Sequence, residues 1–115
     1  MVVRTPIAKR WHAIPTGGTA VAVGEIIQET EVPGGWAYDA QLVRDDGSLL
    51  RLTVTMSWPD YNHLCPDGTR EPQDIALDAL HDGVRVIGIE GIGARLDVST
   101  VRRAMARREH RDNNH

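Results

Sequence analysis

Alternating apolar and polar side chains mark the middle of the chain as β-structure. Residues 36–44 and 49–56 both follow this period of two, which is typical of strands with one buried face and one solvated face. The apolar positions are Trp36, Tyr38, Ala40 and Leu42 in the first run, and Leu50, Leu52, Val54 and Met56 in the second. The pattern therefore predicts two half-buried strands.

Residues 19–31 form a third strand-like run, in which we expect Gly24 to mark a β-bulge. Residues 33–35 and 45–48 supply the glycines that tight turns need, so they predict hairpins on both sides of the second run. An antiparallel meander follows from these three runs and two turns.

Helical signals begin at Ser57. A Ser followed three residues later by Asp60 approximates a capping box, and Pro59 suits an early helical position, which predicts a short helix over 58–64. A second helix is predicted from Pro72 to His81, with Gly83 as its stop signal.

The remaining chain predicts one extended segment and one helix. Residues 84–94 combine β-branched side chains with three glycines, so we expect an extended segment and possible fourth strand. A last helix is expected from Asp97 or Ser99 to Arg108, with a narrow apolar stripe of Val101, Ala104 and Met105.

These elements predict an α+β fold: a three- to four-stranded antiparallel meander with two or three helices packed on one face. A chain of 115 residues is long enough for one core. We expect residues 1–18 to form an extended basic arm, 19–110 a single domain, and 111–115 a frayed tail. Trp11 is the expected anchor of the arm.

Charge divides the chain more sharply than its net value of −3 suggests. Residues 1–12 carry a net +3, residues 13–94 a net −9, and residues 95–115 a net +3. Basic ends on an acidic body can attract a second copy or an acidic partner, or pair with their own body. The overall acidity argues against a generally basic nucleic-acid binder.

The residues 57–65 gather groups capable of chemistry, namely Asp60, His63 and Cys65. A Cys–His nucleophile needs its base within hydrogen-bond reach, and a two-residue spacing on a helix points the two side chains apart. The alternative interpretation is a helix start that anchors Trp58, Tyr61 and Leu64 to the sheet, and it is the favoured one.

Metal and nucleotide motifs receive little support. The histidines lack metal-ligand spacing, which leaves only a site assembled from distant residues such as His63, Cys65 and His81. The glycines of residues 88–93 lack the frame of a dinucleotide-binding loop. We therefore expect no cofactor, no metal and no catalytic residue, and the protein is predicted not to be an enzyme.

Residues 94–103 partly match the second half of a bacterial helix-turn-helix, but with a shortened turn that would rotate the following helix. Its arginines could still contact phosphates as an electrostatic stripe. Trp36, Tyr38 and Trp58 could instead form a base-stacking platform, although a helix is expected to cover that apolar sheet face.

The segments VTMSWPDYNHL (residues 54–64) and ARLDVSTVRR (residues 94–103) loosely resemble a set of short bacterial proteins of unknown function. In that set a strand ends in V-T-[LM]-S, a proline-initiated helix follows, and an R-[FL]-D-x-S segment comes later. The resemblance implies a small bacterial α+β domain. It implies no activity, cofactor or catalytic residue.

We therefore predict a small non-catalytic interaction or regulatory module that self-associates, as a homodimer or larger homo-oligomer, or binds another protein. The alternative is a nucleic-acid-associated regulator that uses the basic C-terminal helix. A single cysteine and the lack of a long apolar run favour a cytoplasmic protein without membrane contact. The candidate interaction residues are Arg4, Lys9, Arg10, Trp11, Arg95, Arg102, Arg103, Arg107 and Arg108.

Overall fold

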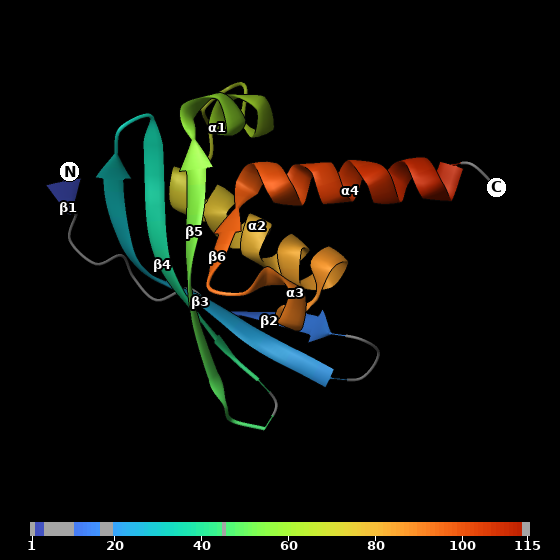
Figure 1. Ribbon diagram of the computed structural model, residues 1–115. Coiled ribbons are helices and arrows are strands. Elements are labelled where there is room, and N and C mark those ends of the chain that lie inside the picture. Colours follow the sequence, from blue (N-terminus) through green and yellow to red (C-terminus); the bar gives the residue numbers. More distant parts are fainter. Residues whose placement is uncertain (1, 4–10, 17–19, 45, 114–115) are drawn as a thin grey trace.

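The protein is an α+β fold in which helices lie against one face of a mostly antiparallel sheet (Figure 1). The computed structural model describes residues 2–3, 11–16, 20–44 and 46–113. The predicted meander is confirmed: β3 (Ala20–Val32), β4 (Gly35–Val43) and β5 (Leu49–Ser57) pair in sequence order, each antiparallel to the next.

Both edges of the meander carry strands that the sequence pattern did not predict. β1 (Val2–Val3) and β2 (Trp11–Thr16) pair antiparallel with different parts of β3, so these residues are strands of the sheet. Pro15 is compatible with β2 because an edge strand need not donate every backbone hydrogen bond. On the other side, β6 (Arg95–Asp97) runs parallel to β5.

The turns of the meander lie where the glycines predict them. Gly34 and Gly47 have φ values of +84° and +86°, which side chains other than glycine rarely adopt. The bulge in β3, however, is not at Gly24, which pairs in register with Leu42. The register shifts between Ile26 and Gln28, so Ile27 is the extra residue.

The helices are α1 (Trp58–Leu64), α2 (Pro72–Ile87), α3 (Ile89–Ile92) and α4 (Val98–Asn113). The prediction for α1 is confirmed, including its Ser57 cap. The extended segment predicted over 84–94 is wrong. Residues 84–87 continue α2 and residues 89–92 form α3, because the apolar positions recur at helical spacing through Val84 and Ile87.

Gly83, the predicted stop signal, lies inside α2 and has a different role. A Cβ atom at this position would lie 2.7 Å from Leu96 Cδ2 and 3.4 Å from Val101 Cγ2. Glycine therefore lets α2 pack closely on Leu96 of β6 and Val101 of α4, and it is not a C-terminal cap, since α2 ends at Gly88 with a φ of +92°. The close approach places α4 directly against α2.

The core lies between the helices and the inner face of the meander. The predicted apolar face of β4 is buried in full, as are Leu52, Val54 and Met56 of β5. Helices contribute Leu80, Val84, Val98 and Val101 from the opposite side. None of the described helices combines the length and the apolarity needed to cross a membrane.

Replacing Gly35 with alanine tests how closely the end of β5 lies against β4. The added Cβ would lie 2.1 Å from the Met56 carbonyl oxygen, a backbone atom that cannot rotate away. We expect Gly35→Ala to lower the free energy of unfolding by at least about 3 kcal/mol in chemical denaturation.

Gly34→Ala is the matched control, because its Cβ would meet no atom within 4 Å and only the positive φ opposes it. That variant should lose about 1–2 kcal/mol. Equal losses in the two variants would contradict the close backbone approach at Gly35.

Candidate protein-interaction surface

The candidate surface lies where the end of β5 turns into α1 and faces the first turns of α4. Ser57 is the N-cap of α1: its Oγ accepts a hydrogen bond from the Asp60 backbone N–H at 3.2 Å. The Ser57 hydroxyl in turn donates to Asp60 Oδ2 at 3.0 Å. This reciprocal pair fixes the Asp60 carboxylate at the start of the helix.

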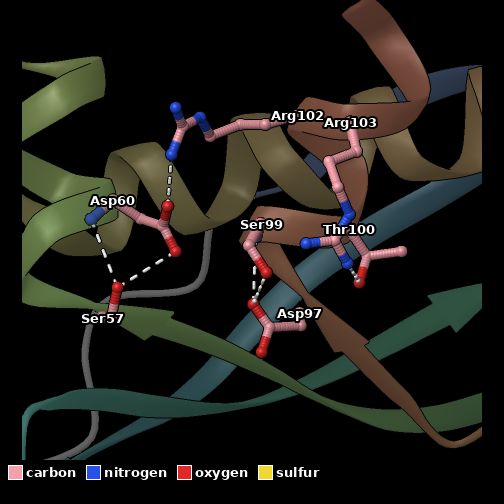
Figure 2. A network of polar contacts seen from close by, with 7 residues as sticks. All are labelled: Ser57, Asp60, Asp97, Ser99, Thr100, Arg102 and Arg103. Carbon is pink, nitrogen blue, oxygen red and sulfur yellow. Dashed lines mark hydrogen bonds and ion pairs between the residues drawn. The ribbon is translucent and has the colours of Figure 1, made fainter. Parts of the chain in front are cut away.

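Asp60 links α1 to α4. Its other oxygen, Oδ1, pairs with the Arg102 guanidinium, 42 positions further along the chain (Figure 2). Asp60 is only 8% exposed, and the Arg102 side chain is 33% exposed. A carboxylate this well buried needs a charged partner, so the ion pair holds the two helices in one relative position.

A second cap orients the first turn of α4. Asp97 Oδ1 accepts hydrogen bonds from the Ser99 backbone N–H at 2.9 Å and the Ser99 hydroxyl at 2.8 Å (Figure 2). The predicted helix entry at these residues is confirmed. The cap starts α4 directly from β6, and thereby turns Arg102 toward α1 while Arg103 remains exposed.

An aromatic cluster attaches α1 to the sheet. Trp36 of β4 contacts Trp58 at a centroid distance of 4.4 Å and Tyr61 at 5.4 Å. Tyr61 also donates a hydrogen bond to the Arg70 carbonyl at 2.5 Å. Burial raises the pKa of Tyr61 above its ordinary value, with the neighbouring Cys65 as the next cause. Tyr61 anchors α1 as predicted, whereas Trp58 remains 51% exposed.

An open groove of about 430 Å³ lies between α1 and α4. Its lining residues are His63, Leu64, Ser99, Arg102, Arg103, Met105, Ala106 and Glu109. A smaller hollow of about 150 Å³ between α2 and α4 shares Leu64, Arg102 and Met105 with it. Leu64 is 41% exposed although the sequence pattern placed it against the sheet. We call the larger hollow the α1–α4 groove.

The structure separates the predicted basic residues into two groups. Arg102 is held by Asp60, whereas Arg95, Arg103, Arg107 and Arg108 are exposed. Arg4, Lys9 and Arg10 lie outside the described residues, and only the backbone of Trp11, in β2, is described. The sequence interpretation thus found the arginines of α4.

That interpretation missed Leu64, Ala106 and Glu109. The available signal was their spacing, because Ser99, Arg102, Ala106 and Glu109 recur every three or four positions and therefore share one side of a helix.

The groups weighed for catalysis do not converge. His63 is exposed, whereas the buried Cys65 thiol contacts Asp67 Oδ1 and accepts from the Arg70 N–H, both at 3.4 Å. Asp60 faces Arg102 rather than His63. Cys65 therefore has a structural role in the loop after α1. In the same loop, hydrogen bonds from Thr69 to the Asp67 carboxylate lower the pKa of Asp67.

The metal and nucleotide interpretations find no arrangement to support them. Within the part of the chain that the structure describes, no group of three or more His, Cys, Asp or Glu side chains could hold a metal ion. Residues 88–93, weighed above as a glycine loop, form the four-residue α3 and its flanking glycines. No protein-family model, curated protein or solved structure matches this chain.

The Asp60–Arg102 pair yields a prediction about stability. Arg102→Met keeps most of the side-chain volume but leaves a buried carboxylate without its cation, so we expect a loss of about 2–4 kcal/mol in the free energy of unfolding. Denaturant titration of Arg102→Met, Asp60→Asn and the double variant measures the coupling. The double variant should lose clearly less than the sum of the single losses.

Arg108→Met is the matched control, because Arg108 is exposed on the same helix. It should change stability by no more than about 0.5 kcal/mol. Additive losses at Asp60 and Arg102 would show that the two side chains do not hold the helices together.

Proposed function

We propose that this protein is a small non-catalytic interaction module that associates with itself through its helical layer. The observation that supports this most directly is the position of α4. Its C-terminal half projects beyond the sheet and the other helices (Figure 1), and residues 106–109 are exposed. A helix gains most of its stability from packing, so a projecting half helix is completed by a second chain.

The distribution of charge supports the same proposal. The meander β3–β5 and α1–α3 come from the acidic part of the chain, whereas α4 carries exposed arginines at 103, 107 and 108. Opposite charges on different parts of one surface favour association between copies and steer their encounter. The partly exposed Leu64 and Met105 add apolar area beside these charges.

Light scattering coupled to size-exclusion chromatography tests self-association. We expect a mass above the 12.7 kDa monomer at low salt, with a shift toward the monomer at high salt because exposed charges are screened. Repeating the run over a concentration series separates association from an unusual shape. A strict monomer at high concentration and low salt would overturn the proposal.

A nucleic-acid-associated regulator is the second candidate, and the exposure of Arg103, Arg107 and Arg108 favours it. These side chains lie on successive turns of α4 and could contact phosphates. Two observations weigh against it: Arg102 is engaged by Asp60, and α4 follows strand β6 instead of the first helix of a helix-turn-helix.

Binding of a fluorescent DNA duplex at about 50 mM salt tests this second candidate. It requires an affinity that falls steeply with added salt and drops in Arg107→Ala/Arg108→Ala, with Arg51→Ala/Arg85→Ala, at two exposed arginines outside α4, as the charge-matched control. Binding that is absent, or equally weakened by the control, would exclude α4 as a nucleic-acid contact.

A further inference from the structure

We propose that two copies of this chain associate through α4, with the two helices antiparallel and crossing at Ala106. The proposal deepens the self-association proposed above and depends on it. It assigns the α1–α4 groove to the α4 helix of a second copy, related to the first by a two-fold axis.

The side of α4 that faces the groove has a small residue at its centre, a positive charge before it along the helix and a negative charge after it. Arg103 lies three positions before Ala106, and Glu109 lies three positions after it; all three are exposed and line the groove. Such an arrangement is self-complementary, because antiparallel pairing about Ala106 brings each Glu109 level with the partner's Arg103.

These charges cannot satisfy each other within one copy. Arg103 and Glu109 are separated by six residues, which is about 9 Å along the helix axis. Side chains on one helix meet at spacings of three or four, so a second helix is needed to join them. Among the residues that the structure describes, Arg103 makes a long contact, 3.4 Å, to the Thr100 hydroxyl of its own helix.

The centre of this groove-facing side of α4 is suited to close contact between helices. Alanine at the crossing point lets two backbones approach, and Met105 and Leu64 provide apolar area on the adjoining side of the groove. Arg102 adds a second positive charge beside Arg103 on this side, while its guanidinium remains paired with Asp60. The Asp60–Arg102 pair thus presents α4 to its partner in a fixed orientation.

The first experiment introduces a charge at the crossing point. Ala106→Glu places a longer, charged side chain where the two helices meet. We expect the dissociation constant of the dimer, measured by light scattering and analytical ultracentrifugation, to rise at least about tenfold. Ala94→Glu is the control: it makes the same substitution at another exposed alanine, which does not line the α1–α4 groove.

The second experiment uses charge reversal and mixing. Arg103→Glu and Glu109→Arg should each weaken the homodimer, because each variant places like charges opposite one another at both contacts. Mixed together, the two variants should form a heterodimer, since both contacts then join opposite charges. A cleavable mass tag on one variant distinguishes the heterodimer from residual homodimers.

The outcomes separate this inference from the broader proposal. Recovery of dimer in the mixture, together with loss in Ala106→Glu but not in Ala94→Glu, establishes the α4 pairing. A wild-type dimer that persists unchanged in Ala106→Glu overturns the pairing but leaves self-association standing. A wild-type protein that is monomeric at all concentrations overturns both. Thermal unfolding of each variant verifies that the fold is retained.

Discussion

The ion pair between Asp60 and Arg102 is the charged contact that links α1 to α4, and it lies beside the apolar core that packs the helices against the sheet. It joins the first turn of α1 to the second turn of α4, and each of these helices has its own cap, Ser57 and Asp97. A carboxylate with little access to water tolerates few alternative arrangements, so the pair specifies a single orientation of the helices as well as stabilising them. Arg102 also lines the α1–α4 groove, so the pair fixes one of the groove's own side chains.

Glycines determine how closely the layers meet. Gly35 brings the start of β4 against the backbone at the end of β5, next to the Ser57 cap, and Gly83 brings α2 against Leu96 and Val101. Side chains at either position would push the elements apart. The packing of the N-terminal half of α4 against α2 is therefore tight, far from the free end of α4.

The parts of the fold that could be predicted from the sequence are those set by local patterns. The alternation in β4 and β5, the turn glycines and the Ser57 cap all act within a few residues, so the meander and α1 could be predicted. β6 could not: it has only three residues, and its partners Thr53–Thr55 lie about forty positions away. The candidate surface shows the same limit. The arginines of α4 are visible in the sequence, but the pairing of Arg102 with Asp60 and the position of Leu64 in the same groove depend on tertiary packing.

The shortness of β6 has a consequence for the edge of the sheet. β6 pairs only with Thr53, Val54 and Thr55, so in the described structure the first half of β5, from Leu49 to Leu52, has no strand on that side. Unpaired backbone at a sheet edge can recruit strands from other molecules, and an exposed Leu49 would encourage this. The charged Arg51 in the middle of this stretch opposes the addition of strands from other molecules, because a charged side chain at an edge strand disfavours such pairing. Its loss would therefore lower solubility more than it would affect folding.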